Sequence, residues 1–566
     1  MVAVKAFSAL KFKGVIKGSS DAFVPLITAV MSHANKMGVT FIESESTSKA
    51  QEIVFAIEDA HKEFELIVTA PIIDGEVCGE VELQVMTGLV SVHSRSLDRI
   101  VPIGVDYISH VSASLIIQQL LSGLIGRHRG SQCAKATFDM TQAGLLAVGQ
   151  YLAGATTEQG AEAFPSGSSD PDLRPPFISQ DGVLFELESL NPSGWQGFWL
   201  ALGVDAKQIG KGWHAFMGRY AKGIAPLPDS MVKVLNGRPY QYLAQVASQY
   251  NVAITPVRSL AERIRDKDVD AVLCDGPYSI EPVDCRPASY QALSDLTHES
   301  LLPLAGIKVV ESCRRIQGPL AGHILALFGA EVIRIEPIGG DPLRDMPPLA
   351  NGSSARFQAL NARKEIIEVD IKSLTGKQQV ASLVKEADVF VHNWAPGKAE
   401  ALQLDEQHLC HINPSLVYAY AGGWGIADDH IALPGTDFMA QAYSGLAEII
   451  SQYSGVKGGT LFTATDVFGG VLAAQAIIMA MYCRVSGAFA LSVGSSLLGA
   501  ATLLTESRLQ QEPDNVRMVG NADQPNDSAS ALQHYTDLSQ LSSHPLTEPF
   551  LTTESYTQLS DLWRPL

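Results

Sequence analysis

Between residues 306 and 425 the chain alternates short apolar runs with helix-like stretches. The strand-like runs are GIKVVES, EVIRIEP, DVFVHNW and LVYAYAGG, and the helix-like ones are GPLAGHILALFGA and SLTGKQQVASLVKEA. Such alternation needs crossover connections, so it predicts an α/β fold built on an open parallel sheet with helices on both faces. Ligands of such sheets lie at the carboxyl ends of the strands. Those ends are expected at Ser312–Gln317, Glu336–Gly340, Asn393–Gly397 and Gly422–Gly425.

Changes in composition divide the 566 residues into four expected parts. A first sheet domain covers 1–175, and a small α+β domain covers 176–300 after the Pro- and Ser-rich stretch FPSGSSDPDLRPP. The α/β domain covers 301–505. Residues 506–566 are rich in Ser, Thr and Gln, which predicts a polar C-terminal tail or a loosely packed wrap.

Charge and cysteine usage exclude several classes of function. The net charge of -19 argues against a nucleic-acid partner, because phosphate contacts need clustered Lys and Arg. Seven scattered cysteines without a C-x-x-C pair predict neither a disulfide framework nor a zinc site, and they fit a reducing, cytoplasmic setting. No compact apolar run of the signal-peptide kind is found near the N-terminus. The apolar stretch from Val471 to Cys483 is shorter than the roughly 20 residues of a membrane span, so we expect a buried helix and no membrane partner.

One segment occurs twice. Residues 88–130 align without a gap on 445–487, so that residue n corresponds to residue n + 357. Seven pairs are identical: Gly88/Gly445, Leu89/Leu446, Ser94/Ser451, Leu115/Leu472, Gln118/Gln475, Arg127/Arg484 and Gly130/Gly487. Upstream, Gln84 matches Gln441 and Glu80 falls opposite Asp437, whereas Ser109 stands opposite Asp466. This predicts an internally duplicated chain.

Five motifs in one order carry a family resemblance. They are PLAGIKVVESCRRIQGPLAGHILALFGAEVIRIEPIGGDPLR, NARKEIIEVDIKS, ADVFVHNWAPG, INPSLVYAYAGGWG and PGTDFMAQAYSGL. Over about residues 303–500 the chain resembles the family III (CaiB/BaiF-type) CoA-transferases, and 88–290 resembles the later part of that fold more weakly. The resemblance implies a Rossmann-like sheet domain plus a small α+β domain. It also makes residues 1–175 a degenerate copy of the sheet domain.

In the transferases of this family, an Asp in a short loop before a long helix is the covalent nucleophile. FTATDVFGG puts Asp466 in that place. The resemblance therefore implies transfer of CoA from an acyl-CoA to a carboxylic acid through an aspartyl anhydride and an aspartyl-CoA thioester, with no metal. The alternative is that Asp466 serves only as the N-cap of a helix over 467–483.

The resemblance also implies contacts to CoA. The candidate residues are Gln317, Arg344, Arg363, Lys364, Asn393 and Trp394. Gln317 would contact CoA through its backbone, and the basic side chains would face the phosphates. Trp394 is otherwise a plain core aromatic, and Arg363 and Lys364 are otherwise a solvated turn.

Three departures from the family pattern keep other functions open. A basic residue usual shortly after the N-F-x-P-G motif is replaced by Ala401 or its neighbours, Thr436 stands where transferases have Tyr and racemases His, and His392 replaces a usual Glu. An acyl-CoA isomerase or lyase of the same fold is one alternative, although Thr cannot act as a base near neutral pH. A non-catalytic acyl-CoA-binding subunit is the other. Since each half lacks what the other has, we expect an intrachain pseudo-dimer, which leaves a further homodimer open.

Overall fold

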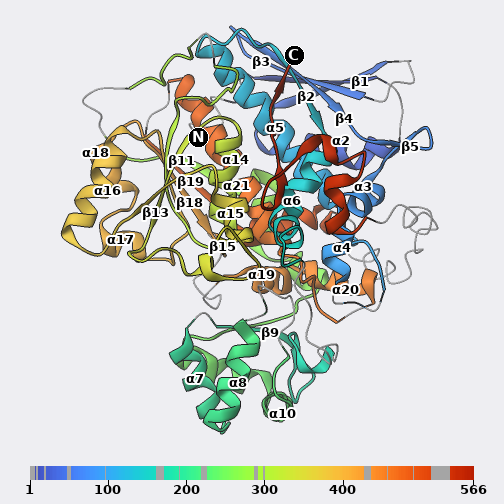
Figure 1. Ribbon diagram of the computed structural model, residues 1–566, viewed down its shortest axis with the longest axis vertical. Coiled ribbons are helices and arrows are strands. Elements are labelled where there is room, and N and C mark those ends of the chain that lie inside the picture. The colour runs from blue at the N-terminus through green and yellow to red at the C-terminus, as the bar shows by residue number, and fades with distance from the viewer. Residues whose placement is uncertain are drawn as a thin grey trace.

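The computed structural model describes most of the chain. The described residues are 7, 10–17, 21–46, 52–95, 97, 99–160, 171–189, 191–217, 219, 226–285, 291–297, 300–425, 435–455, 457–487, 490–510 and 536–566. They form two large sheets with a helical layer between them, and a smaller unit projects from one end (Figure 1). The expectation of an α/β fold is confirmed.

The larger sheet belongs to the second half of the chain. Its order is β11-β19-β18-β17-β12-β13-β16, and all neighbours run parallel except β11, which is antiparallel at the edge. The strands are β11 (Tyr278–Pro282), β12 (Lys308–Ser312), β13 (Glu331–Glu336), β16 (Glu365–Glu368), β17 (Val389–His392), β18 (Val417–Gly422) and β19 (Leu491–Ser496). Strand order reverses between β12 and β17, which is where open α/β sheets bind ligands.

Helices cover both faces of this sheet. They are α14 (Gln317–Leu327), α15 (Ala355–Asn361), α16 (Leu374–Glu386), α17 (Lys398–Leu402), α18 (Glu406–Ile412), α19 (Asp437–Ser444), α20 (Leu446–Ser454), α21 (Ala464–Val485) and α22 (Leu497–Leu504). Ser373 caps α16 as predicted, since its hydroxyl oxygen accepts the Gly376 N–H at 3.0 Å.

The sheet of the first half is mixed, in the order β2-β1-β3-β4-β7-β22. The strands are β1 (Lys11–Lys17), β2 (Thr40–Ser46), β3 (Glu52–Glu58), β4 (Glu63–Thr69), β7 (Lys135–Asp139) and β22 (Arg564–Pro565). The helices are α2 (Val24–Lys36), α3 (Glu80–Met86), α4 (Leu89–Ser94), α5 (Tyr107–His128) and α6 (Met140–Ala155). Only β1–β2 and β4–β7 are parallel pairs.

The projecting unit has its own apolar core, in which Trp195 and Trp199 are fully buried. Its elements are β8 (Phe177–Ile178), β9 (Leu184–Glu188), β10 (Ala253–Pro256), α7 (Pro192–Ala201), α8 (Ala206–Met217), α10 (Asp229–Asn236) and α11 (Tyr240–Gln249). Further along the chain, α12 (Leu260–Arg263) and α13 (Lys267–Asp275) lead back to the larger sheet.

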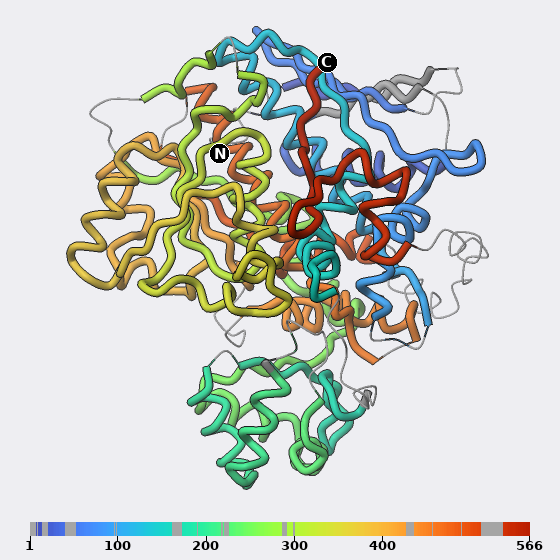
Figure 2. Tube along the Cα trace, in the orientation of Figure 1, coloured from blue at the N-terminus to red at the C-terminus, as the bar shows by residue number. Residues whose placement is uncertain are grey.

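The C-terminal segment is not a polar tail throughout. Residues 511–535 lie outside the described residues, but 536–566 lie across the first half, as the red trace of Figure 2 shows. Trp563 packs on Phe64, with ring centroids 5.3 Å apart, and its indole N–H donates to the Leu301 carbonyl at 3.1 Å. Strand β22 then covers the free edge of β7. A few apolar side chains, widely spaced among polar ones, suffice to dock this segment without regular periodicity.

Helices α5 and α21 lie at the centre of the molecule. Helix α5 packs on β3 and β4 of the first sheet, α21 packs on β18 and β19 of the larger sheet, and the two helices pack on each other. Both are long and apolar enough to cross a membrane, but both are wholly buried inside the fold. The expectation of a buried helix is therefore met, whereas the expected length was too short because the helix extends beyond the apolar run at both ends.

Contacts between these two helices are reciprocal. The Gln118 amide donates to the Val471 carbonyl at 2.9 Å, and the Ser114 hydroxyl donates to Gln475 Oε1 at 2.6 Å. Each contact is the image of the other under the shift of 357 residues. Such i-to-j and j-to-i pairing is the mark of packing about a two-fold axis.

Glycine allows a close approach of α14 to α21. A Cβ on Gly470 would lie 2.7 Å from the Gln317 carbonyl oxygen and 3.0 Å from Leu320 Cβ, both of which are fixed by α14. Helix α6 offers a matched control, because a Cβ on Gly149 would meet nothing within 4 Å.

We predict opposite effects of alanine at these two helical glycines. Gly470→Ala should lower the free energy of unfolding by about 1–3 kcal/mol because it overpacks the α14–α21 contact. Gly149→Ala should raise it by about 0.5–1 kcal/mol, since Ala loses less backbone entropy on folding. Urea denaturation measures both, and a Gly470→Ala protein as stable as the wild type would contradict the close packing.

Candidate active site

Asp466 lies in the first turn of α21, not at its cap. The helix begins at Ala464. Its N-cap residue is Thr463, whose side chain makes no capping hydrogen bond. The alternative that Asp466 is only an N-cap therefore does not hold. Its side chain is buried, and in the part of the chain that the structure describes its carboxyl group forms no hydrogen bond or ion pair.

The start of α21 is capped instead by a carboxylate from another helix. Asp437 Oδ1 accepts the backbone N–H groups of Thr465 at 2.7 Å and Asp466 at 2.9 Å, as well as the Thr465 hydroxyl at 2.6 Å. Asp437 Oδ2 accepts the Gln441 amide at 2.6 Å. Because Asp437 satisfies these donors, the Asp466 carboxyl is not needed to stabilise the helix start.

The first copy repeats this capping arrangement. Glu80 accepts the backbone N–H groups of Ile108 and Ser109, both at 2.8 Å, and the Gln84 amide at 2.7 Å. The Ser109 hydroxyl also donates to Glu80 at 2.7 Å and is buried. The Ser109 hydroxyl is thus part of the capping network, whereas the carboxyl group of its counterpart Asp466 is not. The alignment of Glu80 with Asp437 was the sequence signal for this network.

Burial raises the pKa of Asp466 to about 8, and the negative charge of Asp437 adds to the effect while Arg315 opposes it. Glu188 raises the pKa of Asp466 further. Glu188 ends β9 of the projecting unit, and its carboxylate accepts the Thr436 hydroxyl at 3.5 Å. The first half of the chain thus supplies a carboxylate whose charge acts on the nucleophile candidate of the second half.

Arg315 has a backbone conformation that few residues adopt. Its φ is +67°, in the left-handed region that normally favours glycine. It lies in the loop after β12, at the reversal of strand order. A strained arginine next to a buried carboxyl group at such a place is typical of a functional site.

The two loops at this switch point are joined by Asn393. Its side chain accepts the Arg314 N–H at 2.9 Å and donates to the Arg314 carbonyl at 2.7 Å. Gln317, at the start of α14, donates its amide to the Gly422 carbonyl at 3.1 Å and packs against the Gly469 and Gly470 turn of α21. Asn393 and Gln317 therefore lie at the carboxyl edge of the sheet, where the sequence placed them.

A group of cations that sequence reasoning missed borders Trp394. Lys398 Nζ lies 5.3 Å from the centroid of the Trp394 ring, which is itself largely buried against Phe390 and His392. Burial lowers the pKa of Lys398, and the charges of Arg314 and Lys372 lower it further. The signal was present in the sequence, because Lys398 follows directly on NWAPG, ahead of the position of Ala401.

Two of the side chains expected to bind the CoA phosphates have acidic partners within the protein. Lys364 Nζ is fully buried, pairs with Glu311 at 2.7 Å and donates to the Pro319 carbonyl at 2.7 Å. Arg344 pairs with Glu336 at 2.8 Å and lies over the Phe357 ring. Both belong to an ion network around Arg334, so each of these cations already has an acidic partner inside the fold. A pattern of basic residues does not say which ones have an acidic partner inside the fold.

Arg363 and His392 serve other contacts. Arg363 is exposed and donates to the Ser560 carbonyl at 2.7 Å, which ties the C-terminal segment down. His392 is buried, shares a 2.6 Å hydrogen bond with the Tyr418 hydroxyl, and burial lowers its pKa to about 3. The Trp394 N–H donates to its Nδ1 at 3.3 Å, so both ring nitrogens are hydrogen-bonded inside an aromatic cluster. Among the described residues, no group of three or more His, Cys, Asp or Glu is arranged to hold a metal ion.

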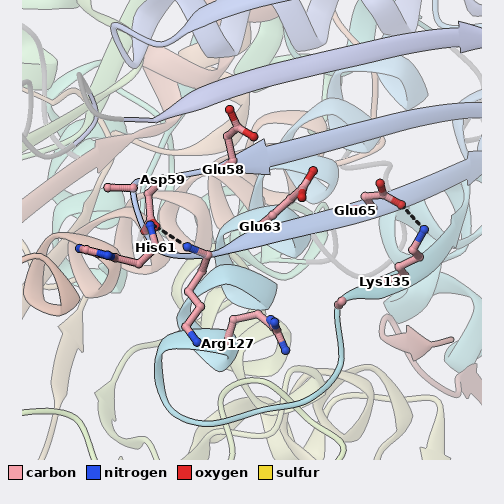
Figure 3. Close-up of a pocket in the computed structure, with 10 residues that line it drawn as sticks. Glu58, Asp59, His61, Glu63, Glu65, Arg127 and Lys135 are labelled. Atoms are coloured by element: carbon pink, nitrogen blue, oxygen red, sulfur yellow. Dashed lines mark hydrogen bonds and ion pairs between the residues drawn. The ribbon is translucent and has the colours of Figure 1, made fainter.

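The first sheet carries a separate hollow of about 410 Å³ (Figure 3). Two of its acidic side chains have partners, since Glu65 pairs with Lys135 at 2.5 Å and Asp59 contacts His128 at 2.6 Å. None of the site residues expected from the sequence lines it.

Comparisons with known proteins point to one family. The family model described as CoA-transferase family III matches residues 76–272 and 304–536. The chain is 34% identical to a succinate–glutarate CoA-transferase of Agrobacterium fabrum, over 32% of this chain and 47% of the relative. It is 32% identical to the succinyl-CoA:glutarate CoA-transferase of Mus musculus, over 36% and 47%, and 32% identical to an acetyl-CoA:oxalate CoA-transferase of Acetobacter aceti, over 32% and 47%. The chain thus spans about half the length of these curated relatives.

The raised pKa of Asp466 gives a signed prediction for stability. Between the ordinary value of 3.8 and about 8, the folded protein holds a proton that the unfolded chain releases, so stability from this group falls as the pH rises through that window. Asp466→Asn cannot ionise, and we predict that its melting temperature exceeds that of the wild type by more at pH 9 than at pH 5.

Thermal unfolding at the two pH values measures this difference. Asp405→Asn is the control, because Asp405 is an N-cap whose pKa is lowered by hydrogen bonds from His408 although burial opposes the shift. It should gain no stability at pH 9. An Asp466→Asn protein with the same advantage at both pH values would contradict the raised pKa.

Proposed function

We propose that this chain, which belongs to CoA-transferase family III, moves CoA from an acyl-CoA to a carboxylic acid, with Asp466 as the nucleophile. One observation carries the proposal. Asp437 caps α21, so the buried carboxyl group of Asp466 sits at a helix start with no structural partner recorded in the described chain. A helix N-terminus favours the carboxylate and the oxyanions that form beside it.

The chemistry proceeds by two exchanges at one side chain. The Asp466 carboxylate attacks the thioester carbonyl, which gives a mixed anhydride and releases the CoA thiolate. The thiolate attacks the Asp466 carbonyl of the anhydride, which frees the first acid as its carboxylate and leaves an aspartyl-CoA thioester. The acceptor carboxylate then attacks the carbonyl of this thioester, which gives a second mixed anhydride and releases the CoA thiolate. The thiolate attacks the acceptor carbonyl of that anhydride, which forms the new acyl-CoA and restores the Asp466 carboxylate.

The residues at the switch point suit the substrate CoA. Arg314, Lys372 and Lys398 supply positive charge for its phosphates, and the exposed part of the Trp394 face lies beside them. Asn393 holds the two loops together, and Gln317 positions the first turn of α14 against α21. Arg315 lowers the pKa of Asp466, so it favours the ionised nucleophile that the first step needs.

The two halves form an intrachain pseudo-dimer with a single complete site. The reciprocal contacts of α5 and α21 support this, and so does Glu188 of the projecting unit, whose charge raises the pKa of Asp466. In the first copy Ser109 bonds to Glu80 and has no base to activate it, so that copy has no nucleophile. Free cysteines at all seven positions are in keeping with a cytoplasmic enzyme.

Chemical trapping tests the nucleophile. We predict that the protein incubated with succinyl-CoA, glutarate and hydroxylamine gains a hydroxamate at Asp466, detected by mass spectrometry. Asp466→Ala should lose both the adduct and CoA transfer while it stays folded, because Asp437 keeps the helix capped.

Ser109→Ala is the matched control in the first copy. It removes the hydroxyl that bonds to Glu80 and should leave trapping at Asp466 unchanged. Transfer by Asp466→Ala within a few-fold of the wild type would overturn the assignment. A panel of other acyl-CoA donors and acids covers the case in which these two substrates do not fit.

A further inference from the structure

A small cavity lies where the two copies and the projecting unit meet. Its volume is about 30 Å³. Figure 1 shows β9 directly beneath α19 at this junction, with α4 and α20 nearby. Its polar wall consists of His93, Arg174, Glu186, Arg219, Gln441 and Lys457. None of these residues takes part in the chemistry proposed for Asp466.

The wall carries three cationic side chains and one carboxylate. Arg219 is buried, pairs with Glu186 at 2.8 Å and lies 3.8 Å over the Phe438 ring, yet its Nη1 has no hydrogen-bond partner within the described chain. Lys457 pairs with Asp172 at 3.5 Å, but the Asp172 side chain is 79% exposed. Arg174 is buried at the same wall. A buried cavity with excess positive charge is stabilised by a bound anion.

Size and donor geometry select the kind of anion. By the same measure of volume, a water-sized group needs about 10–15 Å³, so about two oxygen-sized atoms fit. A carboxylate presents two such oxygens, and arginine binds it with two parallel hydrogen bonds. The apolar wall provided by Phe438 and Ala447 suits the methylene group next to it.

The cavity is joined to the nucleophile in two ways. Gln441 lines it and donates to Asp437, which in turn accepts the Asp466 N–H. Glu186 lines the cavity, and Glu188, two residues further along the same face of β9, accepts the hydroxyl of Thr436, the residue before Asp437. Two residues of a strand span about 6.6 Å, which is within the reach of a short diacid.

We infer that this cavity binds a carboxylate group of a small organic acid, and that it holds the distal carboxylate of the acceptor while the proximal one reacts at Asp466. The second part rests on the proposed function. This second part specifies the class of acceptor. An acid with a second carboxylate is preferred over a monocarboxylic acid of the same length.

Calorimetry on the full chain tests the inference without any need for turnover. Succinate and propionate are the probes, and the variants are Lys457→Met and Arg219→Met, with Arg219→Lys to retain the charge. Succinate should bind at least tenfold more tightly than propionate, and each Met variant should weaken succinate binding at least tenfold. Lys233→Met is the control, since Lys233 forms an exposed pair with Asp229 on α10 and should change nothing.

Each outcome decides part of the claim. Wild-type succinate affinity in a folded Lys457→Met protein would overturn the site, even if Arg219→Met fails to fold. Propionate and formate that bind as tightly as succinate, and weaken alike in Lys457→Met, would keep a site for a free carboxylate and overturn the distal role. Failure to trap Asp466 with succinate binding intact would instead count against the proposed function alone.

Discussion

The contact between α5 and α21 is the interaction on which the rest of the structure depends. Each helix is too apolar to face water, and each packs its other side on the sheet of its own half of the chain. The hydrophobic effect therefore favours burying the two helices against each other, and the reciprocal bonds of Gln118 and Gln475 fix their register. This contact fixes the position of one copy relative to the other. As a result, the loop before α5, the loop before α21 and the projecting unit lie close together.

Capping explains why one copy can react and the other cannot. A carboxylate at the start of α3 or α19, Glu80 or Asp437, binds the same two backbone N–H groups in each copy. This leaves the third helical residue free to vary without loss of the fold. It is Ser109 in one copy, bound to Glu80, and Asp466 in the other, where burial keeps the pKa high and Arg315 opposes that effect.

Much of the fold was predictable, because strand–helix alternation and the repeat are properties of residues close in sequence. The four expected strand ends coincide with the ends of β12, β13, β17 and β18. What the sequence could not show depends on distant partners. Lys364 and Arg344 could not be known to pair with buried Glu311 and Glu336, and the docking of Trp563 follows from no local pattern. The cations around Trp394 converge only once β12, β16 and β17 are assembled in one sheet.

The central claim is that one site needs both halves. It is tested by expressing residues 1–300 and 301–566 as separate chains, alone and together, and by scoring hydroxylamine trapping at Asp466. The cut leaves β11, which pairs with β19, and Glu188 on the first piece, and it exposes α21 on the second. We predict that neither piece alone is both soluble and trapped, and that the pair co-purifies one to one and is trapped. A monodisperse 301–566 fragment that forms the hydroxamate by itself would contradict the account.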